Sequence, residues 1–278
     1  MSDLNMFSLA VETYQRLLPE LKQRVARATV PIQVQTPADN APTVADLVEL
    51  IQPTPPQTGM LGQCEDGAPF LLDLSGQETG SILLVGDPDS GKDHHLQTVV
   101  DSTIRLNAPH EVQVAVLTRN VDAWKPIAGM PGYSSHFSGI FAWYEQGAAD
   151  LVHQLASLAE DRSSSRRSGA TVLLVIDDLS GVFDADFETQ NGLHWLLVDG
   201  PFSHIRPIAS LDASLCSVNP FWVDTFRTFL IGKIEKGSAL EEMGFSPEPD
   251  AMSLIPGLEY CAFMGQEWMK YRVPALNF

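Results

Sequence analysis

The stretch "SILLVGDPDSGKD", residues 81–93, decides the fold of this chain. An apolar run leads into a short glycine-containing segment, and an amphipathic pattern over about residues 93–107 follows it. Gly86, Gly91 and Lys92 have the G-x-x-x-x-G-K spacing of a phosphate-binding loop. Such a loop works because small residues let backbone N–H groups converge on an anion at the positive end of a helix. The stretch therefore predicts a P-loop between a buried strand and a helix.

The loop also predicts a site for ATP and Mg²⁺, but its charges argue against one. Asp93 stands where a Ser or Thr hydroxyl usually binds Mg²⁺. With Asp87 and Asp89 it sets three carboxylates against Lys92, and each like-charge contact at ~4 Å costs on the order of 4 kcal/mol at a dielectric of 20. Two interpretations stay open, a nucleotide-free scaffold and a site where Asp93 is an unusual Mg²⁺ ligand. The candidate nucleotide-binding residues are Gly86, Asp87, Pro88, Asp89, Ser90, Gly91, Lys92 and Asp93.

A second acidic motif follows the apolar run "TVLLVI", residues 171–176. A continuous apolar run that ends in carboxylates is typical of a central buried strand in a parallel sheet. If nucleotide binds, Asp177 is the expected second ligand of Mg²⁺, and Asp178 is the candidate that positions the attacking water. The alternative is that the pair caps the next helix or lies in a solvated loop.

Alternating strand and helix patterns from about residue 60 onward predict an α/β fold with a mostly parallel sheet covered on both faces. A helix is expected over about residues 148–162, besides the one after the loop. The final hairpin is expected to turn near Gly265 and Gln266. The other expected strands are residues 69–74, 81–86, 111–118, 171–179, 193–198 and 226–231.

The sequence divides into three parts. Residues 1–30 have apolar positions near a 3.6 period and predict an N-terminal helical arm. Residues 31–59 are rich in proline and predict a linker, within which Thr43 would cap a short helix. Residues 60–278 are the predicted P-loop domain. The prolines of the linker are Pro31, Pro37, Pro42, Pro53, Pro55 and Pro56.

Charge and composition limit the possible partners and the location. The formal net charge is −18, with 17 basic against 35 acidic residues, which disfavours DNA binding by a lone copy. A ring of copies could still present Arg166 and Arg167 to a central channel. The three cysteines fit neither a disulfide framework nor a metal site and are expected to be buried. No apolar stretch is long enough to span a membrane and no signal peptide is recognisable, so a cytoplasmic protein is expected.

The segment "LGQCEDGAPFLLDLSGQETGSILLVGDPDSGKD", residues 61–93, resembles the start of the motor domain in the FtsK/SpoIIIE and HerA superfamily. Gly67, Pro69, Asp73 and Leu74 match the short strand segment that precedes the P-loop strand in that superfamily. The resemblance extends over about residues 60–274. It implies a RecA-like fold, assembly into hexameric rings, and ATP hydrolysis that moves DNA or drives protein export.

Three departures from the superfamily pattern bear on activity. Asp93 replaces the Mg²⁺-binding hydroxyl, Asp178 replaces the usual Glu, and Gly200 stands near the expected sensor glutamine, in the segment "GLHWLLVDGPFS". Together they favour a degenerate ATPase that acts as a structural or regulatory partner, with a protein partner or further copies of itself. The alternatives are an active ATP-driven translocase and a nucleotide-sensing switch that does not hydrolyse.

Three arginines and two histidines are further candidates for a functional role. The resemblance implies an arginine finger, and Arg119, Arg206 and Arg227 are all candidates, none of them anchored in a motif. His94 and His95 fall in the first turn of the helix after the loop and are expected to be exposed. A metal role for them would need partner ligands that the sequence does not display.

Overall fold

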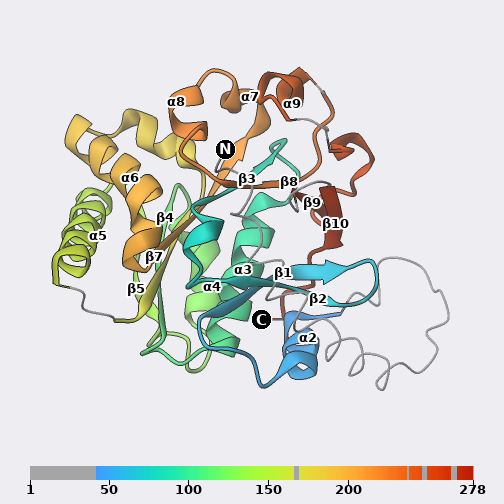
Figure 1. The fold of residues 1–278 in the computed structure, drawn as a ribbon, viewed down its shortest axis with the longest axis horizontal. Helices are drawn as coiled ribbons and strands as arrows, with labels where there is room; N and C mark the ends of the chain where they lie inside the picture. Colours follow the sequence, from blue (N-terminus) through green and yellow to red (C-terminus); the bar gives the residue numbers. More distant parts are fainter. Residues whose placement is uncertain (1–41, 166–168, 237, 246–248, 264–267, 278) are drawn as a thin grey trace, which may run out of the picture.

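The computed structural model describes residues 42–165, 169–236, 238–245, 249–263 and 268–277 (Figure 1). The predicted N-terminal arm, the pair Arg166 and Arg167, and the turn at Gly265 and Gln266 lie outside these residues. None of the helices that the structure describes has the length and apolar character needed to cross a bilayer.

Among the described residues, one ten-stranded sheet forms the centre of the fold, in the order β2-β1-β10-β9-β8-β3-β7-β6-β4-β5. The six strands from β8 to β5 are parallel to one another, and the other four pair antiparallel. The α/β fold with a mostly parallel sheet is therefore confirmed. The strands are β1 Thr58–Cys64, β2 Pro69–Asp73, β3 Ile82–Gly86, β4 Val112–Thr118, β5 Phe137–Ala142, β6 Thr171–Ile176, β7 Ile205–Asp212, β8 Thr228–Ile231, β9 Glu259–Phe263 and β10 Trp268–Arg272.

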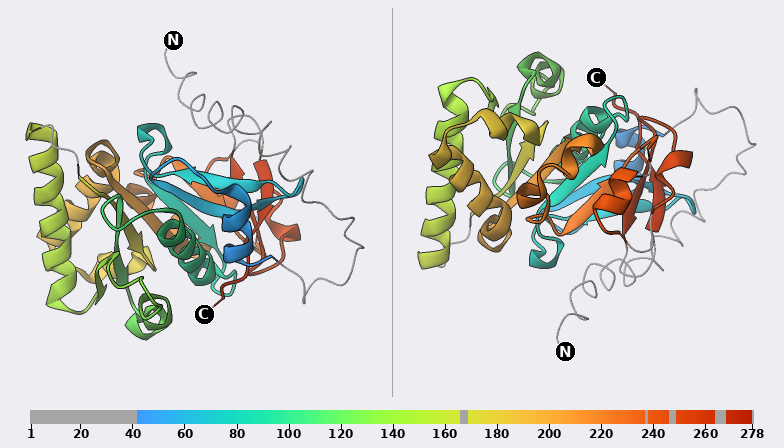
Figure 2. Two further views of the ribbon diagram at one scale, coloured as in Figure 1. Left: turned by 90° about the horizontal axis from the view of Figure 1, so that it is seen from below. Right: turned by 90° about the horizontal axis from the view of Figure 1, so that it is seen from above.

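Helices cover both faces of the parallel part of the sheet (Figure 2). One apolar cluster joins α5 and α6 to one face, and a second cluster joins α3 and the short α4 to the other. The predicted helices after the P-loop and near residues 148–162 are confirmed as α3 and α5. The helices are α2 Val44–Ile51, α3 Lys92–Leu106, α4 Lys125–Ala128, α5 Gln146–Ser165, α6 Phe187–Asp199, α7 Ala213–Cys216, α8 Pro220–Val223 and α9 Ser238–Glu242.

The short helix α2 has the predicted cap. The Thr43 hydroxyl accepts a hydrogen bond from the Asp46 backbone N–H, and the Asp46 carboxylate accepts one from the Thr43 backbone N–H, which completes a capping box. The apolar side of α2 packs on Met60, which is fully buried. The division of the chain at residues 30 and 59 remains a prediction.

The central strands β3 and β6 are apolar because helices cover both faces of the sheet there. All six residues of β6 and all five of β3 are buried. All three cysteines are buried thiols outside any disulfide, as expected. This core fixes the carboxyl ends of β3, β6 and β7 beside one another, and the acidic residues found in the sequence lie at these ends.

The predicted strand at residues 193–198 is wrong, because this segment belongs to helix α6. Asp186 caps that helix by accepting hydrogen bonds from the backbone N–H groups of Glu188 and Thr189. Sequence analysis missed three strands: β1, β5 and β7. Of these, β7 lies at the centre of the sheet, between β3 and β6. Pro207 lies inside it, and a proline normally argues against a central strand because it cannot donate a ladder hydrogen bond.

This error also misplaced the sensor position. Gly200 lies at the end of α6, before β7 begins, so it is at the amino end of the parallel strands. In the β3–β7 register Gly86 pairs with Asp212, which places Asp212 beside the start of the P-loop. Asp212, and not Gly200, therefore lies at the carboxyl end of β7, on the side of the P-loop.

Candidate functional site

The P-loop connects β3 to α3 as predicted, and its backbone conformation depends on Gly91. Gly91 has a φ of +83°, a left-handed conformation that side chains disfavour. A Cβ atom at this position would also overlap the backbone of Gly257. The Ser90 carbonyl next to it accepts hydrogen bonds from the Gly257 N–H (2.8 Å) and the Tyr260 hydroxyl (3.0 Å). Gly257, just before β9, and Tyr260, in β9, thus hold the backbone of the P-loop in this conformation.

Lys92 bends back onto its own loop and is almost completely buried, with 6 % exposure. Its ammonium donates to the carbonyl oxygens of Gly86 (3.1 Å) and Asp87 (2.7 Å). It also forms an ion pair with Asp212 Oδ1 at 2.8 Å and lies 3.5 Å from the Ser90 hydroxyl. Because an ammonium has three N–H donors, these acceptors saturate it. The charge that would stabilise phosphates is already neutralised within the protein.

The other acidic residues of the loop differ in their surroundings. Asp87 is tied to the chain after β8, since its carboxylate accepts a hydrogen bond from the Glu235 N–H (2.7 Å). Pro88, Asp89 and Asp93 are exposed. The eight predicted loop residues lie together at the start of α3. The solvent-facing side of the loop is acidic, because the carboxylates of Asp89 and Asp93 are exposed there.

Asp177 lies at the end of β6 and is 7 % exposed. One of its oxygens, Oδ2, accepts hydrogen bonds from the Thr118 hydroxyl and from the Trp124 indole N–H, each at 2.9 Å. Burial is the main cause that raises the pKa of Asp177, and repulsion from Asp93 and Asp178 adds to it. Asp93 is thus near enough to Asp177 to affect its pKa. The role of the two carboxylates as Mg²⁺ ligands remains a prediction.

Asp178 has a different role from its neighbour. Its φ is +68°, and its side chain caps the following turn by accepting a hydrogen bond from the Ser180 N–H at 3.0 Å. Its carboxylate also forms an ion pair with Arg119 Nε at 2.8 Å. The capping role, which sequence analysis kept as an alternative, is thus present in the structure.

The three arginine candidates do not share one environment. Arg206 is 1 % exposed and donates to the carbonyl oxygens of Leu74, Gly76 and Gly80. Burial lowers the pKa of Arg206 to about 10. The guanidinium of Arg206 is thus held inside the chain, which argues against its candidacy as an arginine finger. Arg227 is exposed, and Arg119 is engaged with Asp178.

The expectation that His94 and His95 are exposed is also wrong. His95 is fully buried beneath the loop, and its Nε2 lies 3.1 Å from the Leu61 carbonyl oxygen. Its ring packs 4.4 Å from that of Tyr260, centroid to centroid. Burial lowers the pKa of His95 to about 3. His94 is partly buried. The apolar β1 strand, which covers this side of α3, explains the difference.

The loop keeps the shape of a nucleotide site but only part of its chemistry. The left-handed glycine, the helix start and the lysine fit a phosphate group. The hydroxyl ligand for Mg²⁺ is absent at Asp93, and Lys92 is saturated. Among the residues that the structure describes, no three His, Cys, Asp or Glu side chains are placed to hold a metal ion. Any Mg²⁺ would depend on phosphate and water oxygens beside Asp93 and Asp177.

Sequence analysis missed Asp212, Gly257 and Tyr260 as parts of this site. Asp212 ends the run "IRPIASLD", which has the same form as the run that ends in Asp177. An apolar run that ends in an aspartate could therefore have predicted a second buried strand with its acidic end near the P-loop. Gly257 and Tyr260 lie about 165 residues further along the chain than the loop, and no local pattern connects them with it.

A parallel sheet with a P-loop between β3 and α3, and with acidic residues at the ends of β6 and β7, defines a RecA-like P-loop fold. Comparisons with solved structures support this class. The chain matches Thermomonospora curvata EccC (ATPases 2 and 3) in complex with a signal sequence peptide, at a TM-score of 0.65 and 17 % identity over 90 % of this chain and 45 % of that one.

Two other structures give the same result. The cytoplasmic domain of the Thermomonospora curvata type VII secretion ATPase EccC matches at a TM-score of 0.65 and 18 % identity, over 90 % of this chain and 29 % of that one. EssC (ATPases 2 and 3) from Geobacillus thermodenitrificans matches at 0.64 and 12 % identity, over 88 % and 47 %. The chain spans less than half the length of these structures. No protein-family model and no curated protein sequence matches it.

Proposed function

We propose that this chain is a degenerate FtsK/HerA-like P-loop protein that serves as a structural or regulatory partner, with weak or absent ATP hydrolysis. The environment of Lys92 carries this proposal. Its ammonium is saturated by two loop carbonyls and by Asp212 Oδ1 at 2.8 Å. A phosphate group would have to displace a carboxylate from a nearly buried cation, and it would then lie close to that carboxylate.

Two other residues support the same conclusion. Asp93 offers a negative charge where the superfamily has a neutral hydroxyl ligand for Mg²⁺. Asp178 shares its carboxylate between Arg119 and the turn that it caps, so it is not free to orient a water molecule. Binding of Mg²⁺ and activation of water thus each lack the group that the superfamily uses.

A protein partner is part of the proposal. EccC and EssC each hold more than one ATPase unit, and this chain is similar to less than half of either structure. We infer that the chain acts beside other ATPase units, either further copies of itself or a different protein. The net charge of −18 argues against direct DNA binding by a monomer.

One observation favours a second candidate, an active ATP-driven translocase. Asp93 and Asp177 are near enough for one to raise the pKa of the other. Two approaching carboxylates can share a divalent cation, so Asp93 could replace the missing hydroxyl in Mg²⁺ binding. In that case Lys92 would stabilise phosphates and Asp178 would position water.

Phosphate release by the purified chain, with Mg·ATP and with or without DNA, separates these functions. We expect no turnover above that of the Lys92→Ala variant, which serves as the control. Turnover by the wild type that Lys92→Ala abolishes would contradict the proposal. Tight binding of ATP without turnover would instead indicate a nucleotide-sensing switch. The mass in solution, measured on the same sample, distinguishes a ring from a monomer.

A further inference from the structure

Helix α6 presents large apolar side chains to solvent. Phe187, His194 and Val198 lie on one side of this helix, because positions separated by seven and then four residues share one side. Phe187 is 79 % exposed and Val198 is 40 % exposed. Phe221 of α8, which is 61 % exposed, stacks on the His194 ring with the two ring centroids 4.5 Å apart. We call these four residues the α6 face, and a group of this kind is typical of an interaction surface.

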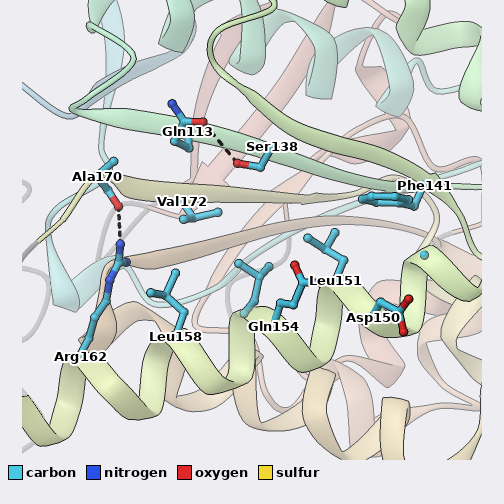
Figure 3. A pocket seen from close by; sticks show the side chains of 12 residues that line it. Gln113, Ser138, Phe141, Asp150, Leu151, Gln154, Leu158, Arg162, Ala170 and Val172 are labelled. Atoms are coloured by element: carbon cyan, nitrogen blue, oxygen red, sulfur yellow. Dashed lines mark hydrogen bonds between the residues drawn. The ribbon is translucent and has the colours of Figure 1, made fainter.

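The apolar residues beneath α5 differ from those of the α6 face. Figure 3 shows Leu151 and Leu158 pointing from α5 into the cavity between this helix and the sheet. Leu151 and Leu155 are each only 6 % exposed, so they already belong to the core. The rings on the α6 face are instead open to another chain.

The surroundings of the α6 face are acidic. Residues 184–202 and 213–224, which include α6 and α8, contain five carboxylates and neither lysine nor arginine. Three of the five, Asp184, Asp186 and Glu188, lie at the start of α6. The Arg119 guanidinium lies 4.0 Å from the Asp184 carboxylate. Because complementary charge selects partners, the occupant of this face is expected to be basic as well as apolar.

The predicted N-terminal arm has a matching pattern. The apolar side chains of its first half are Phe7, Val11, Tyr14 and Leu18. Positions 187, 191, 194 and 198 of α6 have the same spacing, with Asn191 as the polar member, and in a helix either set extends over about 17 Å. Basic residues follow in the second half of the arm, after Pro19: Lys22, Arg24 and Arg27.

The charges also select a direction. If the arm is antiparallel to α6, Leu18 meets Phe187, and Lys22 continues toward the carboxylates at the start of α6. If the arm is parallel, its basic half continues past the end of α6. There the guanidinium of Arg227 lies over the Phe202 ring, 5.7 Å from its centroid, and would repel other cations. The antiparallel direction is therefore favoured.

A second copy can supply the arm more directly than the same chain. The described chain starts at Pro42 beside α2, which packs with α3 on one side of the sheet. The helices α6 and α8 belong to the apolar cluster on the other side. Figure 1 shows α2 at the lower right and α6 with α8 at the upper left. Residues 30–41 would have to lead round the sheet, whereas the arm of a neighbouring copy meets the α6 face from solvent.

We propose that the α6 face binds the N-terminal arm of a second copy of this chain, as a helix antiparallel to α6. The apolar residues of the arm cover Phe187, His194 and Phe221, and the basic residues after Pro19 lie beside the carboxylates at the start of α6. An amphipathic helix laid on an apolar surface is a common mode of recognition. The inference rests on the proposed function in one respect, since it names the partner which that function leaves open.

Cysteine cross-linking of the full chain tests the contact and its direction. Two single variants with different tags are mixed and oxidised, and the native thiols are buried. We expect Leu18→Cys to cross-link to Phe187→Cys several-fold more than to Val198→Cys, whereas Phe7→Cys should prefer Val198→Cys. Absence of cross-links between copies, or equal yields in the four mixtures, would overturn the proposal. A cross-link within one chain that carries both Leu18→Cys and Phe187→Cys, in preference to the mixture, would assign the face to the arm of the same copy and overturn it too.

Light scattering measures the association itself. Phe221→Asp should weaken self-association about tenfold, and Tyr144→Asp, at another exposed aromatic residue, should leave it unchanged. Lys22→Glu should weaken it about threefold, and Glu188→Lys in the same chain should restore it, because each contact joins one arm to one α6. A monomer at all concentrations would overturn this inference, and it would leave the absence of ATP turnover untouched. Turnover by a wild type that associates through α6 would contradict the proposed function alone.

Discussion

The two sides of the P-loop differ in how much of a nucleotide site they retain. The inner side is packed: Gly91 lies against Gly257, and the Ser90 carbonyl accepts two hydrogen bonds from the segment around β9. The outer side is open and acidic, with Asp93 exposed and Lys92 tied to its own protein. The comparison shows that packing and hydrogen bonds within the chain can hold the shape of a P-loop. The shape is therefore no evidence that the chemistry is present.

The largest change in the free energy of unfolding is expected on the packed side, from the protonation of His95 at low pH. The folded-state pKa of His95 is lowered by burial to about 3, whereas an unfolded histidine titrates near 6.5. The unfolded chain thus binds the extra proton between these two values, and stability falls as the pH is lowered through that window. At pH 3 the loss should be on the order of 4 kcal/mol relative to pH 7.

Urea unfolding as a function of pH measures this effect. His95→Gln keeps a group able to donate to the Leu61 carbonyl but cannot be protonated, so its stability should vary less between pH 6.5 and 4. An unchanged pH profile in His95→Gln would mean that other groups, such as paired carboxylates, cause the acid sensitivity.

Gly91→Ala should be the next largest change. The variant combines a left-handed φ with an overlap against Gly257, and we expect a loss of about 3 kcal/mol in the free energy of unfolding. Gly132 is the matched control, since its φ is +84° and no atom lies within 4 Å of a Cβ built there. Gly132→Ala should cost about 1 kcal/mol. Equal losses in the two variants would show that packing does not hold the loop.

Tyr260→Phe removes one hydrogen bond from the packed side. The Tyr260 hydroxyl donates to the Ser90 carbonyl at 3.0 Å, and its loss should reduce stability by about 1 kcal/mol. Tyr144, which is 82 % exposed, provides the control, because Tyr144→Phe should change nothing. Thermal unfolding of the three proteins is sufficient to compare them.

The smallest energy is expected on the open side, for the ion pair between Lys92 and Asp212. A double-mutant cycle of Lys92→Met and Asp212→Asn should give a coupling of roughly 0.5 to 1 kcal/mol, because Asp212 is partly exposed to solvent. The coupling should decrease in high salt. Absence of coupling at low salt would mean that Asp212 does not hold Lys92 in solution, and the main support for a scaffold role would be lost.

The sequence was most informative where the pattern was local. The loop, the strand before it and helix α3 follow from one continuous stretch, and the cap of α2 follows from Thr43. Errors arose where tertiary packing overrode a local rule. The central strand β7 contains Pro207, which argues against a strand in the sequence. The apolar run at residues 193–198 predicts a strand but belongs to helix α6. The contact between Lys92 and Asp212 joins residues 120 positions apart, so it needed the sheet order to be recognised.

Calorimetric titration of Mg·ATPγS into four proteins tests the central claim most directly. The proteins are the wild type, Asp93→Ser, Asp212→Asn and the variant with both changes. We predict no measurable binding by the wild type and restored binding by the double variant, with each single change giving at least a tenfold gain where binding can be measured. Tight Mg²⁺-dependent binding by the wild type that Asp93→Ser weakens would contradict this account, because the carboxylate would then be a metal ligand.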